Sequence, residues 1–155
     1  MRPHSFDDYA GQQHLVGKNA PLRKSIEAGR IPSMILWGPP GVGKTTLVTV
    51  ISQITERNFI TLSAVSSGVK EVREVIEQAK KVNLFSKGNP ILFIDEIHRF
   101  NKSQQDSLLG AVEDGTITLI GATTENPSFE VISPLLSRCQ VYVLKSLERD
   151  DLIQL

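Results

Sequence analysis

Short apolar runs alternate along this chain with segments in which apolar residues recur at helical spacing. The runs are residues 34–37, 59–62, 91–94, 117–120 and 141–144. Between the second and third runs, apolar residues recur every three or four positions and so share one face of a helix: Val69, Val72, Val75, Ile76, Ala79 and Val82. This alternation is typical of parallel strands joined by crossover helices, and it predicts an α/β fold.

Local signals place two more helices. Asn101 is a favourable N-cap residue with Gln104 three positions later, and Gly115 is a stop signal, which predicts a helix ending near Asp114. Another helix is predicted to begin near residue 44, where apolar residues again recur at helical spacing.

Composition narrows the class of protein. The 155 residues, 40% of them apolar, are enough for one globular domain and too few for a second. Lys plus Arg and Asp plus Glu both total 17, so no overall charge attracts the domain to nucleic acid, and any contact with DNA must be local. A single cysteine, Cys139, excludes an internal disulfide. The apolar runs are too short to span a bilayer, so we expect a cytoplasmic protein without membrane contact.

The segment after the first apolar run matches the phosphate-binding pattern G-x-x-x-x-G-K-[ST]. It reads Gly38, Pro39, Pro40, Gly41, Val42, Gly43, Lys44 and Thr45, and Thr46 completes the expected nucleotide-binding set. Glycines let successive N–H groups point at phosphate oxygens at a helix N-terminus. We expect Lys44 to neutralise the β- and γ-phosphates of ATP and Thr45 to bind Mg²⁺. The alternative is a Gly/Pro turn that happens to contain Lys-Thr.

The third apolar run ends in two adjacent carboxylates, Asp95 and Glu96. Ligands collect at the carboxyl ends of parallel strands, so Asp95 is a candidate for the Mg²⁺ shell and Glu96 for the base that polarises the attacking water. This tandem pair favours hydrolysis over phosphotransfer. A polar strand exit is the structural alternative. His98 lacks a second metal ligand at helical spacing, so we interpret it as a structural or surface histidine.

Two later positions are candidates for contact with the γ-phosphate. If the fourth run lies between the first and third strands, Thr123 or Thr124 can orient the attacking water, although a Thr-rich turn would have the same sequence. Arg138, between a helix and the last strand, is locally unpaired in this interpretation. From the edge of the domain it could reach a neighbouring subunit's γ-phosphate, although most surface arginines have no such role.

Together with Arg2-Pro3 and residues 6–17, these motifs resemble the clamp-loader branch of the AAA+ ATPases. Residues 95–106 and 113–130 are similar to the family of replication-associated recombination protein A, bacterial relatives of Werner helicase interacting protein. The resemblance covers essentially the whole chain. It implies a P-loop NTPase three-layer sandwich with a five-stranded parallel sheet of order 5-1-4-3-2 and helices on both faces.

The resemblance also implies roles for single residues. Tyr9 and Gln12 would line the adenine pocket, Thr123 would be the first sensor, and Arg138 would be a finger that acts in trans. Residues 1–145 would form the ATPase core and residues 146–155 the start of a helical lid. The lid's sensor arginine and the C-terminal oligomerisation region are missing, which indicates a fragment of a longer protein.

At the level of function, the resemblance implies a DNA-dependent ATPase in replication fork maintenance, recombination and DNA repair. Its partners would be gapped or forked DNA and single-strand/double-strand junctions, further copies in a tetramer or hexamer, and single-strand-binding protein. It would be nucleoid-associated in a bacterium. Lys70 and Arg73, near the start of the amphipathic helix, are the candidate DNA contacts, although solvated surface charge would give the same pattern.

Other functions fit parts of the sequence. The chain could be a clamp-loader-like or Holliday-junction-motor subunit, or a nucleotide-binding switch with little turnover, which Glu96 argues against. Residues 95–98 also fit the DExH tetrapeptide of helicases, but those enzymes need a second motor domain. A small-molecule kinase is disfavoured because no acceptor-binding segment is visible.

Overall fold

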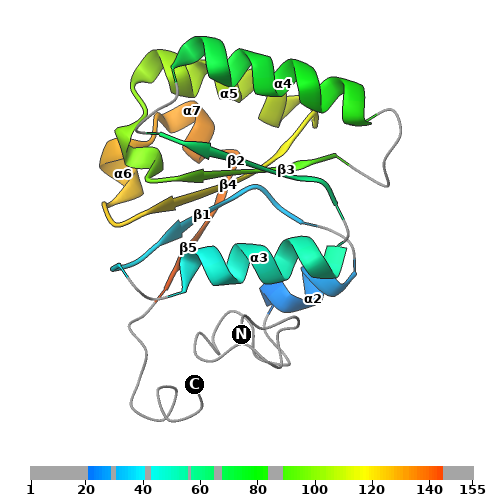
Figure 1. The fold of residues 1–155 in the computed structure, drawn as a ribbon. Helices are drawn as coiled ribbons and strands as arrows, with labels where there is room; N and C mark the ends of the chain where they lie inside the picture. The colour runs from blue at the N-terminus through cyan, green and yellow to red at the C-terminus, as the bar shows by residue number, and fades with distance from the viewer. Residues whose placement is uncertain are drawn as a thin grey trace.

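The computed structural model describes residues 21–28, 31–40, 43–55, 57–64, 68–83 and 89–144. In these residues, five strands form one parallel sheet in the order β2-β3-β4-β1-β5 (Figure 1). The strands are β1 Met34–Trp37, β2 Phe59–Ser63, β3 Ile91–Asp95, β4 Thr118–Thr123 and β5 Gln140–Val143. Read from the other edge, this order is 5-1-4-3-2, so the predicted topology is confirmed.

Helices cover both faces of this sheet and make a three-layer sandwich. The helices are α2 Pro21–Glu27, α3 Lys44–Thr55, α4 Val69–Asn83, η1 Ile97–Arg99 (a 3₁₀ turn), α5 Lys102–Glu113, α6 Pro127–Glu130 and α7 Ser133–Leu136. In Figure 1, α2 and α3 lie on one face, while α4 to α7 lie on the other. Each face has its own apolar core. Successive residues of one strand point into opposite cores: Met34 belongs to one core and Ile35 to the other.

The amphipathic pattern of α4 determines how this helix packs. Val72 and Ala79 are fully buried and Ile76 is nearly so, while the charged positions of the helix remain exposed. Burial of this stripe in the apolar core that it shares with β2, β3 and α5 is the main stabilising contribution of the helix, because its surface is otherwise polar.

Helix α5 begins and ends as its sequence predicts. The Asn101 side chain accepts a hydrogen bond from the backbone N–H of Gln104, and the Gln104 side chain accepts one from the backbone N–H of Asn101. Such a reciprocal capping box satisfies two N–H groups that the first helical turn leaves unpaired. At the other end, Gly115 adopts a φ of 79°, a conformation that glycine reaches without steric cost.

Strand β4 is longer than the apolar pattern predicts. The pattern ends at Ile120, whereas the strand continues through Gly121 and Ala122 to Thr123, and all six of its residues are buried. Gly121 has weak strand propensity, but a Cβ there would lie 2.9 Å from Cδ1 of Ile97 and 3.0 Å from Cδ1 of Ile35. The missing side chain therefore admits neighbours from both η1 and β1 against the backbone of the central strand.

None of the helices in the described part of the chain is long and apolar enough to cross a membrane.

Candidate nucleotide-binding site

The order of the strands brings three distant motifs to one edge of the sheet. Strand β4 lies between β1 and β3, and in this register Trp37 is opposite Thr123. All strands are parallel, so the loop after β1, the carboxylates after β3 and the hydroxyls after β4 emerge side by side. A role for Thr123 or Thr124 required their strand to lie between the first and third strands, and the sheet has this order.

A cavity of about 490 Å³ opens at this edge. Its lining residues are Pro40, Gly43, Lys44, Thr45, Thr46, Asp95, Glu96, Thr123 and Thr124. All of them come from the phosphate-binding loop, the carboxylate pair and the strand-end threonines. Four other predicted site residues, Tyr9, Gln12, Gly41 and Val42, lie outside the described residues, as does the predicted lid at 146–155.

Lys44 is the cation of this cavity. Its Nζ donates hydrogen bonds to the backbone carbonyls of Gly38 at 2.7 Å and Pro39 at 3.2 Å, which direct it across the loop. Partial burial lowers the pKa of the Lys44 ammonium group from its usual 10.5, and the nearby negative charge of Asp95 opposes this shift. Lys44 is also the first residue of α3, and Gly43 before it has a φ of 90°. The cavity therefore combines a lysine with the positive end of a helix dipole.

Gly38 must be a glycine for a reason other than loop flexibility. A Cβ added there would lie only 2.7 Å from the carbonyl oxygen of Leu144, just after β5. Backbone atoms cannot yield as the end of a side chain can, so a larger residue would separate the loop from this strand. The sequence motif indicated glycines that shape the loop, but it did not indicate this close approach of two chain segments.

Thr45 and Asp95 supply oxygen atoms to the same cavity. A hydroxyl and a carboxylate are ligands that Mg²⁺ prefers, and Mg²⁺ completes its coordination with water and substrate phosphate oxygens. The residues present therefore fit a Mg²⁺ ion. No cluster of three His, Cys, Asp or Glu side chains suited to a metal occurs among the described residues.

Glu96 has an unusual backbone conformation. Its φ of 55° and ψ of 47° make it the one non-glycine residue with positive φ in the described ranges. This left-handed conformation costs about 1–2 kcal/mol for a residue with a side chain, so the surrounding structure must impose it. The Glu96 carboxylate lies 3.5 Å from Nε of Arg99. Both features depend on the turn after β3, and neither follows from the Asp-Glu motif alone.

Thr123 and Thr124 differ in what their hydroxyls contact. Thr123 is 2% exposed, and its Oγ1 lies 2.8 Å from Nδ1 of His98, 2.9 Å from the backbone N–H of Glu125 and 3.3 Å from the Glu125 carbonyl. Thr124 is exposed, and its side chain has no hydrogen bond within the described residues. A hydroxyl offers one donor and two acceptor positions. Thr123 is therefore committed to local contacts, while Thr124 is available to a ligand.

Arg138 has a partner that is distant in sequence. It lies after α7, outside the cavity, and its Nε is 3.9 Å from a carboxylate oxygen of Glu113 at the end of α5. The pairing arises because α5 and α7 pack together, which the local sequence cannot indicate. Both side chains are about half exposed, so the contact is weak. Beside it, burial raises the pKa of the Cys139 thiol to about 11, consistent with a packing role.

The sequence model of one protein family matches residues 34–147, which include every element from β1 to β5. This family is the ATPase family associated with various cellular activities (AAA). The chain belongs to this family. As an AAA ATPase core, it has its P-loop, carboxylate pair and strand-end threonines at the edge where parallel α/β sheets bind ligands.

Individual relatives cover almost the whole chain. Replication-associated recombination protein A of Escherichia coli (strain K12) is 58% identical over 154 residues, 99% of this chain and 34% of that protein. The ATPase WRNIP1 of Dictyostelium discoideum is 50% identical over 98% of this chain and 17% of its own length. The chain thus spans about a third or less of these relatives.

Among solved structures, the Holliday junction branch migration motor RuvB of Thermotoga maritima is similar. It has a TM-score of 0.73 and 33% identity, covering 93% of this chain and 48% of RuvB. The AAA+ fold and the resemblance to replication-associated recombination protein A are therefore confirmed.

Proposed function

We propose that this AAA ATPase core hydrolyses Mg-ATP in the cavity between β1, β3 and β4. The observation that carries the proposal is the convergence of Lys44, Thr45, Asp95 and Glu96 on one cavity from separate segments of the chain. A lysine at a helix N-terminus suits phosphate, and adjacent carboxylates suit a metal and a water. Residues 1–145 would form this core and residues 146–155 the start of its lid.

Each residue has a distinct task in this mechanism. The loop's N–H groups and Lys44 bind the β- and γ-phosphates and stabilise the negative charge on their oxygen atoms. Thr45 and Asp95 would hold Mg²⁺, which would neutralise phosphate charge. Glu96 accepts a proton from the attacking water. Tyr9 and Gln12 would line the adenine pocket.

Thr124 is the better candidate for contact with the γ-phosphate or the attacking water. The Thr123 hydroxyl already has partners in His98 and Glu125, whereas Thr124 lines the same cavity with a hydroxyl free of partners in the described ranges. Thr123 then has a positioning role at the end of β4. The role that the resemblance assigns to Thr123 would thus be divided between two neighbouring threonines.

Arg138 would complete the site of a neighbouring copy. It is exposed and lies outside the cavity of its own chain, so it cannot serve that cavity without rearrangement. Its weak contact with Glu113 would be exchanged for the γ-phosphate held by the next subunit, where a guanidinium stabilises transition-state charge. This role requires a homo-oligomer, which we propose is a tetramer or hexamer formed by the longer protein.

The relatives' names support a role in replication-associated recombination. We therefore place the full protein at gapped or forked DNA and single-strand/double-strand junctions, with single-strand-binding protein as a partner, in the bacterial cytoplasm at the nucleoid. RuvB is described as a Holliday junction branch migration motor, which favours a DNA-dependent motor over a static switch.

ATP turnover by the protein at the length of its relatives tests this function. We expect turnover to rise several-fold with forked or gapped DNA and to fall roughly 10³-fold in Arg138→Ala, as for other trans-acting fingers. Mixing Arg138→Ala with Glu96→Gln should restore part of the activity, because each mixed interface can join an intact finger to an intact base. DNA-independent turnover that survives Arg138→Ala would contradict the oligomeric motor and leave only a general ATPase.

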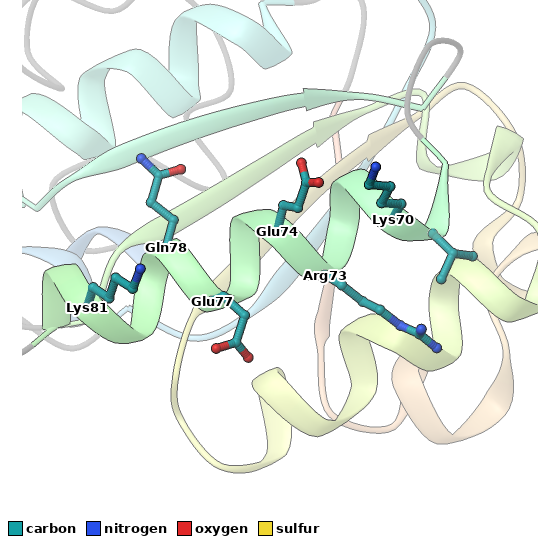
Figure 2. A pocket seen from close by; sticks show the side chains of 7 residues that line it. Lys70, Arg73, Glu74, Glu77, Gln78 and Lys81 are labelled. Carbon is teal, nitrogen blue, oxygen red and sulfur yellow. The ribbon is translucent and has the colours of Figure 1, made fainter.

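Helix α4 carries the candidate DNA contacts, and Figure 2 shows them on its exposed face. Lys70, Arg73 and Lys81 line a groove there with Glu74 and Glu77, so the face carries little net charge. Arg73 extends toward α5 and also lines a small cavity with Ser103, Asp106 and Ser107. DNA contact would therefore be confined to Lys70 and Arg73 at the start of the helix.

The salt dependence of DNA binding tests this contact in the assembled protein. Replacing both Lys70 and Arg73 by alanine should reduce the slope of log K against log salt by about 1–2 per subunit in contact with DNA. Lys24→Ala, on α2 across the sheet from α4, is the matched control. An unchanged slope in the double variant would remove α4 from the DNA interface.

A further inference from the structure

The turn after β3 is attached to strand β4 at two places. Ile97 is fully buried beside Gly121, where even a Cβ would meet its side chain at 2.9 Å. His98 comes next, and its Nδ1 lies 2.8 Å from Oγ1 of Thr123, two residues along β4 from Gly121. Residues two apart in a strand point to the same face, so both contacts lie on one side of β4.

From these contacts we infer that His98 is a positioning residue that fixes Glu96 relative to the end of β4. The inference rests on the proposed hydrolytic function. Glu96 has a left-handed backbone that a free chain disfavours, and it is bounded by Asp95 in the sheet and by the Ile97 and His98 contacts. Without the His98 contact, the turn would keep the apolar contact of Ile97, its internal hydrogen bonds and its packing against α6. It would lose the side-chain hydrogen bond that joins it to the end of β4.

The same hydrogen bond also fixes Thr123. Its Oγ1 accepts from the Glu125 N–H and donates to the Glu125 carbonyl, so it has one acceptor position left for an N–H of His98. The contact set is complete when His98 carries its proton on Nδ1. The histidine then links the turn that carries the base to the strand end that carries Thr124, and motion of either segment would be transmitted to the other.

A cycle of variants in the protein at its relatives' length tests the inference. His98→Ala and Thr123→Val should each lower kcat roughly tenfold, and the double variant should lose little more, because both remove one contact. ATP affinity should change less than about twofold, since the hydrogen bond does not involve Lys44. His98→Asn should recover most of the activity, because its amide reaches the position of Nδ1, whereas His98→Gln places its amide near Nε2 and should not.

Lys102→Ala, at the exposed first residue of α5, is the control with unchanged turnover. Nitrogen-15 NMR of His98 should show the Nδ1–H tautomer, a signal that is assigned by its loss in His98→Asn. Additive losses in the double variant, or equal activity of the Asn and Gln variants, would overturn the inference. Turnover at the wild-type rate in both Lys44→Ala and Glu96→Gln would instead overturn the proposed function. Failure of the inference about His98 can therefore be distinguished from failure of the proposed function.

Discussion

Glu96→Gln is expected to lower ATP turnover by about 10²- to 10³-fold while ATP stays bound. Glutamine keeps the size and shape of the side chain but cannot accept the proton of the attacking water. Glu96 is a cavity residue outside the phosphate-binding loop, so the loop and Lys44 keep their contacts with the phosphates. Single-turnover hydrolysis, measured beside equilibrium binding of ATP, separates the two effects.

The left-handed backbone of Glu96 adds a second expectation for this variant. Glutamine and glutamate tolerate a positive φ equally poorly, so the backbone strain at this position does not change. Glu96→Gln should therefore leave the thermal unfolding temperature nearly unchanged. Its contact with Arg99 is half exposed and contributes little. Glu130→Gln, at an exposed carboxylate on α6 outside the cavity, is the matched control. Undiminished hydrolysis in Glu96→Gln would remove Glu96 as the base.

Lys44→Ala is expected to weaken ATP binding by at least about 30-fold and to abolish measurable turnover. The variant removes the cation of the cavity, and it also leaves the carbonyls of Gly38 and Pro39 without their ammonium donor. Binding of a fluorescent ATP analogue measures the loss, with Lys24→Ala as the control. Binding at wild-type affinity would show that the loop's N–H groups and the helix dipole alone hold the phosphates.

The lowered pKa of Lys44 predicts how ATP affinity depends on pH. Phosphate binding favours the charged lysine, so ATP affinity is highest below the pKa that Lys44 has in the ATP-free protein. The affinity falls as the pH rises through that pKa. Because burial lowers that pKa from 10.5, affinity should begin to fall at a lower pH than an exposed lysine would give. The Lys44→Ala variant should lose this dependence.

The sequence predicted those parts of the site that lie next to a strand end. Lys44, Asp95 and Glu96 each follow an apolar run, and parallel strands must present such residues at one edge. The strand order itself came from the family resemblance, because apolar runs do not reveal which strands are neighbours. Contacts between segments distant in sequence could not be predicted. The choice between Thr123 and Thr124 depends on His98, 25 residues away, and the partner of Arg138 depends on the packing of α7 against α5.

Gly38 gives the site a mechanical property. Its N–H donates to the Thr123 carbonyl on one side, and its Cα faces the Leu144 backbone on the other, where the Leu144 N–H donates to the Trp37 carbonyl. The start of the phosphate-binding loop, the end of β4 and the exit from β5 thus meet at a single joint made of main chain. Such a joint has no side chain to absorb displacement. A displacement of the chain beyond Leu144 would therefore move the start of the loop and the end of β4 together.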